Sequence, residues 1–125
     1  MKKIMMVDDE PDQIFTIRKV LKDAGVDYEL IPAESGKKCL ELLKNNEIPD
    51  LILLDIMMPE MNGWEAFYKL KDNPLWKDIP VVFLTARTDE IAENAGEFLG
   101  EDYIEKPVSL EELKEKIDKV LKKDQ

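Results

Sequence analysis

Short apolar runs alternate along the chain with segments in which apolar residues recur every three or four positions. The runs predict buried strands at residues 3–7, 27–31, 50–54, 79–84 and 102–105. The helical spacing predicts five helices, which begin near Pro11, Ser35, Asn62, Asp89 and Ser109. Strands that alternate with helices in this way indicate an α/β protein, because parallel neighbours need helical crossovers between them.

Turn and capping residues mark the limits of these segments. Gly25 ends the first helix and Asn46 the second, and Ser109 with Glu112 three residues later forms a capping-box pattern at the last. We expect a doubly wound, five-stranded parallel sheet in the order 2-1-3-4-5, within a flavodoxin-like three-layer sandwich with five helices. No internal repeat or linker-like tract is evident, so residues 1–125 are expected to form a single domain.

Acidic residues stand directly after two of the apolar runs. Asp8 and Asp9 follow residues 4–7, and Asp55 follows residues 51–54. Both runs end at the carboxyl edge of the expected sheet, which is where ligands bind in open α/β proteins. Three carboxylates at one edge repel one another unless a cation joins them. Hard oxygen ligands without a thiol or imidazole predict Mg²⁺, with Mn²⁺ as the alternative.

Two further side chains end strands at the same edge. Thr85 follows the fourth run and Lys106 the fifth. Carboxylates, a hydroxyl and an ammonium group together suit phosphoryl transfer, in which a carboxylate attacks phosphorus while cations and donors neutralise the transferring oxygens. Asp55 is the best nucleophile because it stands alone after the central strand, whereas the adjacent Asp8 and Asp9 suit cation binding. The sequence contains no histidine, which excludes a catalytic or phosphorylated histidine on this chain.

The balance of charge narrows the choice of partners. Lysine and arginine number 18 against 28 aspartate and glutamate residues, a formal net charge of −10 at pH 7. This excess of acid disfavours nucleic acids and anionic membranes as partners, since both require a basic surface. Cys39 is the single cysteine and lies in an apolar helical pattern, which indicates a core residue. With no signal-peptide pattern and no long apolar stretch, the expected location is the cytoplasm.

Four segments resemble the signature motifs of the receiver domain of two-component response regulators. They are Val7-Asp8-Asp9-Glu10-Pro11, residues 53–63 (LLDIMMPEMNG), Leu84-Thr85-Ala86 and Tyr103-Ile104-Glu105-Lys106-Pro107. The resemblance extends over residues 3–121, with the expected residue types at the family's functional positions. It implies a domain that receives a phosphoryl group from a sensor histidine kinase or a phosphotransfer protein. The domain would then signal by conformational switching and partner binding.

The resemblance also implies a role for each residue of the site. Asp55 would accept the phosphoryl group, and Thr85 and Lys106 would contact its oxygens, with a cis bond between Lys106 and Pro107. Tyr103 would be the switch aromatic, turning inward as Thr85 moves toward the phosphate. The ligands of Mg²⁺ would be Asp8 (through water), Asp9, Asp55 and the Met57 carbonyl.

Two consequences for function come with the same resemblance. The protein would not be an enzyme acting on other molecules, since it would catalyse only its own phosphorylation and dephosphorylation. An unidentified downstream protein would bind the face formed by the fourth helix, the fifth strand and the fifth helix.

Each of these residues also has an ordinary structural explanation when it is taken alone. Asp8 or Asp9 could cap the first helix, and Thr85 could cap the fourth. Lys106 could be a solvated lysine, and Tyr103 an edge-strand aromatic without a switching role. Their joint occurrence at the ends of four strands favours the phosphoryl-transfer site.

Two other functions use parts of the same pattern. A Mg²⁺-dependent phosphatase or phosphotransferase would share the aspartate nucleophile, but Met57 occupies the position where such enzymes carry a second acid. A flavin-binding protein would share the fold, but its phosphate would need donors where this chain has acidic loops.

One region departs from the family pattern. Residues 94–101 lack the small side chains usual before the fifth strand, and the stretch from Thr85 to Lys106 is slightly short. Arg87 could approach the phosphoryl group or be solvated. The fourth helix is therefore expected to be shortened or shifted, which leaves the downstream partner open.

Overall fold

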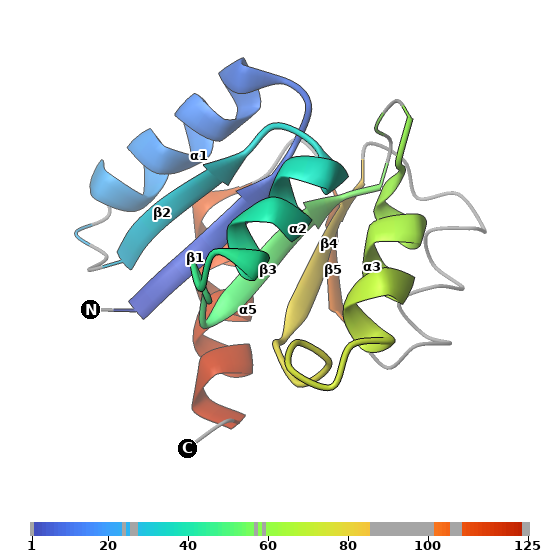
Figure 1. The fold of residues 1–125 in the computed structure, drawn as a ribbon. Coiled ribbons are helices and arrows are strands. Elements are labelled where there is room, and N and C mark those ends of the chain that lie inside the picture. The colour runs from blue at the N-terminus through green and yellow to red at the C-terminus, as the bar shows by residue number, and fades with distance from the viewer. Residues whose placement is uncertain are drawn as a thin grey trace.

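Five strands and four helices make up the part of the chain that the structure, a computed structural model, describes (Figure 1). The described residues are 2–23, 25, 28–56, 58, 60–85, 102–105 and 109–123. The elements are β1 (Lys2–Val7), α1 (Pro11–Asp23), β2 (Tyr28–Ala33), α2 (Gly36–Lys44), β3 (Leu51–Asp55), α3 (Gly63–Lys71), β4 (Val81–Thr85), β5 (Asp102–Glu105) and α5 (Leu110–Lys123). The helix expected to begin near Asp89 lies outside the described residues.

The strands form one parallel sheet in the order β2-β1-β3-β4-β5, which confirms the predicted topology (Figure 1). β1 and β3 are neighbours, with Val7 opposite Leu54. β3 and β4 are neighbours as well, with Asp55 opposite Leu84. The carboxyl ends of β1, β3 and β4 therefore lie next to one another, at the edge where the sequence analysis expected the acids to meet.

The end of β2 differs from the prediction. The strand continues to Ala33, beyond the predicted range 27–31, because the Ala33 carbonyl accepts a hydrogen bond from the Asp8 N–H (3.0 Å). Pro32 is compatible with this strand because β2 lies at an edge of the sheet. Backbone groups of successive residues point to opposite sides, so Pro32, which lacks an N–H, presents its nitrogen to the open edge rather than to β1.

Two apolar cores cover the two faces of the sheet, because successive side chains of a strand point to opposite faces. Helices α2 and α3 lie on one face, and α1 and α5 lie on the other (Figure 1). The core beneath α1 and α5 consists of aliphatic residues and Met6. The two helices contribute to it the buried residues Ile14, Ile17, Leu21, Leu113, Ile117 and Leu121.

The core beneath α2 and α3 is rich in aromatic side chains. The ring centroid of Phe83 in β4 lies 5.2 Å from that of Phe67 and 4.9 Å from that of Trp64. Tilted ring pairs at such distances add about 0.5–1.5 kcal/mol each to the stabilisation from burial. This side of the sheet is therefore packed by large rigid rings, which lie on α3 and β4, the two elements that follow Asp55 in the chain.

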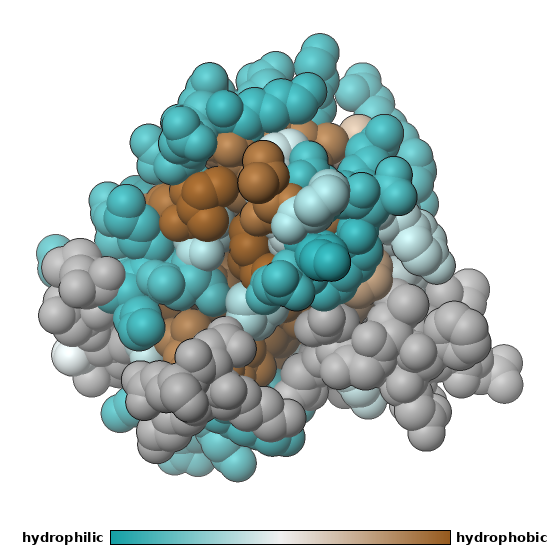
Figure 2. Space-filling view, turned by 60° about the horizontal axis from the view of Figure 1, so that its bottom comes forward, coloured by the Kyte–Doolittle hydropathy of each residue, from teal (hydrophilic) through white to brown (hydrophobic). Residues whose placement is uncertain are grey.

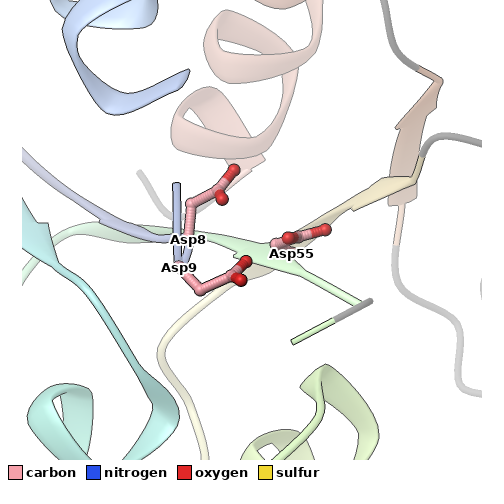
Figure 3. A group of neighbouring side chains, drawn as sticks. All are labelled: Asp8, Asp9 and Asp55. Carbon is pink, nitrogen blue, oxygen red and sulfur yellow. The ribbon is translucent and has the colours of Figure 1, made fainter. Parts of the chain in front are cut away.

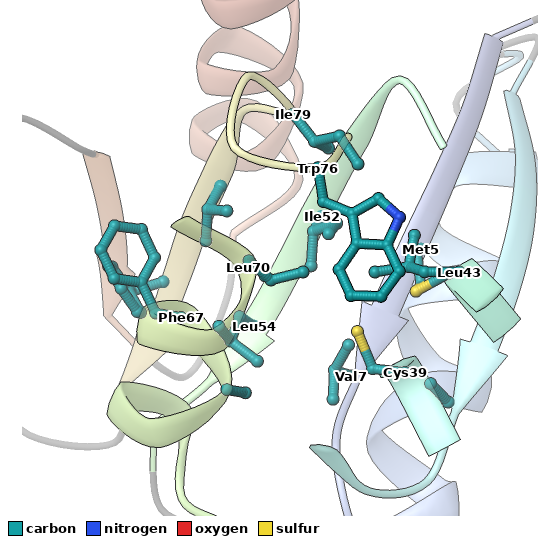
Figure 4. Packing of buried hydrophobic residues seen from close by; sticks show 14 of the residues in the cluster. Met5, Val7, Cys39, Leu43, Ile52, Leu54, Phe67, Leu70, Trp76 and Ile79 are labelled. Atoms are coloured by element: carbon teal, nitrogen blue, oxygen red, sulfur yellow. The ribbon is translucent and has the colours of Figure 1, made fainter. Parts of the chain in front are cut away.

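The turn between α3 and β4 completes the same core. Trp76 in this turn is buried, and Figure 4 shows its ring directed toward Cys39 and Leu43 of α2. The Ile79 N–H donates to the Trp76 carbonyl (3.0 Å), so Ile79 belongs to the turn and β4 begins at Val81, later than predicted. Cys39 is buried, as expected, and burial raises the pKa of its thiol from 9.0 to about 12.

Side-chain oxygens cap three of the described helices. Ser35 at α2, Asn62 at α3 and Ser109 at α5 each accept a hydrogen bond from the N–H three residues further on, at 3.0, 3.0 and 3.1 Å. Such caps contribute about 1 kcal/mol each to helix stability. The left-handed backbone at Gly25 (φ 70°) follows α1, and that at Asn46 (φ 66°) follows α2, at the breaks that the sequence predicts.

The chain is acidic, with a formal net charge of −10 at pH 7. Figure 2 shows a face on which hydrophilic residues surround smaller apolar areas. None of the helices within the described residues combines the length and the apolar character that crossing a membrane requires.

Candidate functional site

Three aspartates come together at the carboxyl edge of the sheet (Figure 3). Asp8 and Asp9 follow β1, and Asp55 is the last residue of β3. One carboxylate oxygen of each residue lies within 4.8 Å of the others. Asp8 and Asp55 are buried, with 0% and 4% of their surface exposed, while Asp9 is half-buried. The structure thus brings together the three acids that the sequence analysis expected to meet.

Backbone hydrogen bonds hold Asp8 on both sides. Its N–H donates to the Ala33 carbonyl of β2 (3.0 Å), and its Oδ1 accepts from the Glu10 N–H (2.9 Å). Pro11 then begins α1, a position at which proline is favoured because its missing N–H is not needed. Asp8 therefore shapes the turn that leads to α1 as well as belonging to the acidic cluster. The N–H that it accepts belongs to Glu10, which precedes the helix, so this bond stabilises a turn and is not a helix cap.

The chain after Asp55 is closed into a loop at its base. The Ile56 N–H donates to the Leu84 carbonyl of β4 (3.1 Å), and the Gly63 N–H at the start of α3 donates to the Ile56 carbonyl (2.9 Å). A Cβ atom on Gly63 would lie 2.5 Å from the Asp55 carbonyl oxygen, so only glycine allows α3 to approach this closely. Glu60, within the loop, adopts a left-handed backbone conformation with φ 62°.

The donor set of the cluster fits a hard divalent cation. Carboxylate oxygens are the ligands that Mg²⁺ and Mn²⁺ prefer in proteins. One carboxylate oxygen of each of the three aspartates lies within 4.8 Å of the others, so all three can face a single ion. Asp8, Asp9 and Asp55 would therefore hold such an ion between them.

The remaining predicted site residues lie wholly or partly outside the described part. Thr85 ends β4 opposite Glu105 of β5, so its backbone reaches the edge of the sheet at which Asp55 lies. Its side chain, Met57 and Lys106 are not among the described groups. Their roles in the site stay predictions.

Tyr103, the predicted switch aromatic, lies on β5. Its side chain is half-buried and packs against the core beneath α2 and α3. The Nζ atom of Lys116 on α5 lies 5.9 Å from the centroid of its ring, within the range of a cation–π interaction. The ring therefore connects β5 to α5, but its switching role stays a prediction.

Two residues that support the cluster were not predicted from the sequence. Ala33 acts through its backbone carbonyl, which leaves no chemical signature in its side chain. Gly63 follows Asn62, near which the third helix is predicted to begin, but the sequence pattern does not predict its close approach to the Asp55 backbone. A glycine directly after a capping asparagine was the one available signal, because glycine there is not needed for the cap itself.

The chain and its fold are similar to known signalling proteins. Residues 4–118 match the family described as the response regulator receiver domain. The response regulator SaeR of Staphylococcus aureus is 37% identical over 122 residues, which are 97% of this chain and 51% of that protein. The N-terminal domain of a response regulator receiver protein from Methanoculleus marisnigri JR1 has a TM-score of 0.74 and 42% identity, with 97% of each chain covered.

A relative of another kind matches over the same region. A protein of Vibrio cholerae named as a probable cyclic di-GMP phosphodiesterase is 44% identical over 115 residues, 91% of this chain and 25% of that protein. The chain thus spans about a quarter to a half of the length of these curated relatives. The family match includes the motifs around all three aspartates. The chain belongs to the response regulator receiver family, whose members are phospho-acceptors of two-component signalling, bind Mg²⁺ through an aspartate cluster and interact with histidine kinases or phosphotransfer proteins.

Proposed function

We propose that Asp55 of this chain accepts a phosphoryl group from a sensor histidine kinase or a phosphotransfer protein, in a reaction supported by Mg²⁺. The observation that carries the proposal is the convergence of Asp8, Asp9 and Asp55 within 4.8 Å at the carboxyl edge of the sheet. Family membership supports the class of reaction. The positions of the three aspartates support Asp55 as the acceptor.

Asp55 is the acid best placed to act as the nucleophile. Asp8 is fully buried and one of its oxygens already accepts the Glu10 N–H, so it suits a fixed supporting role. Asp9 is adjacent to it and directed into the same cluster (Figure 3). Asp55 is the last residue of the central strand β3, and Gly63 packs closely against its backbone. A rigid backbone lowers the entropic cost of bringing its carboxylate to the phosphorus.

The transfer itself exchanges one bond for another. An Asp55 carboxylate oxygen attacks the phosphorus of the donor's phosphohistidine, a P–O bond forms and the P–N bond breaks. The imidazole leaves with the bonding electron pair and takes up a proton. The Thr85 hydroxyl and the Lys106 ammonium group are assigned to the remaining phosphoryl oxygens, where they would neutralise and orient them. A bound Mg²⁺, held by the three aspartates and the Met57 carbonyl, would supply further charge neutralisation.

Phosphorylation serves signalling rather than turnover of a substrate. The phosphoryl group carries a charge of about −1.5 to −2, which replaces the single charge of the Asp55 carboxylate at the edge that also carries Asp8 and Asp9. Such a change biases a two-state equilibrium, which we assign to Thr85 and Tyr103. The downstream protein would bind the face that contains β5 and α5. A donor of this class implies a cytoplasmic location, and residues 1–125 would act as a single domain.

The test is the intact mass of the protein after incubation with acetyl phosphate, with and without Mg²⁺. We expect one phosphoryl adduct that requires Mg²⁺ and disappears in Asp55→Asn. Asp72→Asn is the matched control, because Asp72 is an exposed acid at the far end of α3. An adduct of wild-type yield in Asp55→Asn would show that another residue is the acceptor. Peptide mapping of the adduct would then identify it.

A further inference from the structure

The loop after Asp55 is supported at a second point, away from its base. Met61 is half-buried and packs against the core beneath α2 and α3. Its side chain meets Gly36, the first residue of α2, so closely that a Cβ atom there would lie 2.8 Å from Sδ, 3.1 Å from Cγ and 3.3 Å from Cβ. The loop is thus fixed by Gly63 at its base and by the contact between Met61 and Gly36 at its side.

The same short segment that holds Met61 also holds Asp8. Residues 33–36 connect β2 to α2, and the Ala33 carbonyl at the start of this segment accepts the Asp8 N–H (3.0 Å). Gly36 at its end contacts Met61. Ser35, between them, anchors the segment to α2 through its cap to the Lys38 N–H (3.0 Å). The connection of residues 33–36 therefore contacts both the backbone of Asp8 and the loop that follows Asp55.

We propose that the connection 33–36 is a positioning element that sets the distance between Asp8 and the loop after Asp55, with Gly36 and Met61 as its adjustable contact. It donates no ligand and touches no reacting atom. The inference rests on the proposed function, because it assigns these residues to the same cation and phosphoryl-acceptor site. Its effect is on the spacing of the acids.

The size of residue 36 decides this spacing. In Gly36→Ala the new Cβ meets the Sδ and Cγ atoms of Met61 at 2.8 and 3.1 Å, and these atoms can move aside only by giving up part of their packing against the core. The adjustment displaces Met61, and with it the loop backbone, by a few tenths of an ångström. Met61→Ala removes both of these close contacts and leaves only the Cβ contact at 3.3 Å. Mg²⁺ demands near-ideal octahedral geometry, so small movements of its ligands weaken binding.

The experiment uses a size exchange between the two residues. Gly36→Ala adds a methyl group where the Met61 side chain already lies, and Met61→Ala removes that side chain beyond Cβ. The double variant Gly36→Ala/Met61→Ala places the new methyl group in the space that the Met61 side chain has left. The dissociation constant for Mn²⁺ is measured from the electron paramagnetic resonance signal of the free ion, well below every melting temperature. The rate of phosphorylation by acetyl phosphate is measured as a function of Mg²⁺ concentration.

We expect each single variant to bind Mn²⁺ on the order of 10-fold more weakly than wild type, as residues that support metal ligands do. The half-saturating Mg²⁺ concentration should rise in step, while the rate at saturating Mg²⁺ stays within about 3-fold of wild type. In the double variant the affinity should recover to within about 3-fold of wild type. Recovery by the second substitution is not expected of two independent destabilising changes.

Leu40→Ala is the control for general loosening of α2, because Leu40 is a half-buried side chain of the same helix and the same core. It should lower the melting temperature and leave the Mn²⁺ affinity unchanged. Wild-type Mn²⁺ affinity in both single variants would overturn the inference, and so would equal weakening in Leu40→Ala. A wild-type protein that binds Mn²⁺ but forms no phosphoryl adduct would contradict the proposed function alone. A wild-type protein that binds no Mn²⁺ would contradict both.

Discussion

In β1 and β3, apolar residues fill the strand interiors, whereas acids occupy the carboxyl ends. Residues 4–7 and 51–54 are all apolar with 0% of their surface exposed, and the acids Asp8 and Asp55 come next in the chain. Burial of each large apolar side chain stabilises the fold by about 1.5–3 kcal/mol. Gathering carboxylates has the opposite effect, because like charges repel. Packing in the strand interiors therefore stabilises the fold, whereas the acids at the strand ends oppose it.

The largest change in stability is expected from a substitution in the apolar core. Phe67 of α3 is 2% exposed and packs against Phe83 of β4. Phe67→Ala should lower the free energy of unfolding by about 3–5 kcal/mol, through lost burial and the cavity left behind. Urea denaturation followed by circular dichroism measures this loss. Phe15→Ala is the control, since Phe15 is 66% exposed and its truncation should cost less than about 0.5 kcal/mol.

If the two regions have separate roles, Phe67→Ala should still bind Mn²⁺ with wild-type affinity at temperatures where it is folded. A parallel loss of affinity would show that the aromatic core sets the acid geometry directly. In that case the apolar strand interiors and the acidic strand ends would not have separate roles.

A second prediction concerns the acids. Mg²⁺ at one hundred times its dissociation constant should stabilise the wild-type protein by about 2.7 kcal/mol, because the ion binds only the folded state. Asp8→Asn should lose most of this increment. In EDTA the variant should be at least as stable as wild type, since it removes one of three repelling charges and its amide oxygen can still accept the Glu10 N–H. Thermal unfolding with Mg²⁺ and with EDTA gives both quantities.

Asp50→Asn is the matched control for this measurement. Asp50 precedes β3 at the opposite edge of the sheet, where its Oδ2 accepts the Lys3 N–H (2.7 Å). Its replacement should leave the Mg²⁺ increment intact. Equal increments in wild type and Asp8→Asn would remove Asp8 from the cation site.

The smallest effect is expected at the amino end of β2. The Tyr28 hydroxyl donates to Asp118 Oδ1 on α5 (3.1 Å). Burial, followed by the hydrogen bond and the negative charge of Asp118, raises the pKa of Tyr28 above 10.0. Tyr28→Phe should lower the free energy of unfolding at pH 7 by about 1 kcal/mol.

The pH dependence of this contribution has a definite sign. Above pH 10 the unfolded chain releases the Tyr28 proton before the folded protein does, so wild-type stability falls as the pH rises through the folded pKa. The difference between wild type and Tyr28→Phe should therefore shrink above pH 10, which denaturation at pH 8, 10 and 11 would measure. A difference that stays constant up to pH 11 would mean that folding does not raise the pKa of Tyr28.

Much of the fold could be predicted because its signals are local. Continuous apolar runs identified the central strands, and the rule for doubly wound sheets then placed Asp8, Asp9 and Asp55 together. The end of β2 was missed because Pro32 usually terminates a strand, whereas at a sheet edge it interrupts no ladder bond. Sequence alone describes pairing partners poorly where the decisive neighbour is far away in the chain.

The supporting contacts around the acids could not be predicted for the same reason. Gly36 and Met61 are 25 positions apart in the numbering, and neither carries a charge or a hydrogen-bonding side chain that would mark it. Their contact exists only because α2 and the loop after β3 converge on the same face of the sheet. Patterns of residue type therefore predict the residues that carry out the chemistry more readily than the residues that position them.

The position of Pro32 also bears on how this protein behaves at high concentration. A strand at the edge of a sheet exposes backbone groups to which a strand of another molecule can bind, and extended pairing of this kind leads to aggregates. Pro32 removes one donor from the open edge of β2, and the charged, exposed Glu29 lies on the same strand. β2 is therefore a poor template for the addition of a strand from a second molecule, which lowers the tendency of this edge to aggregate.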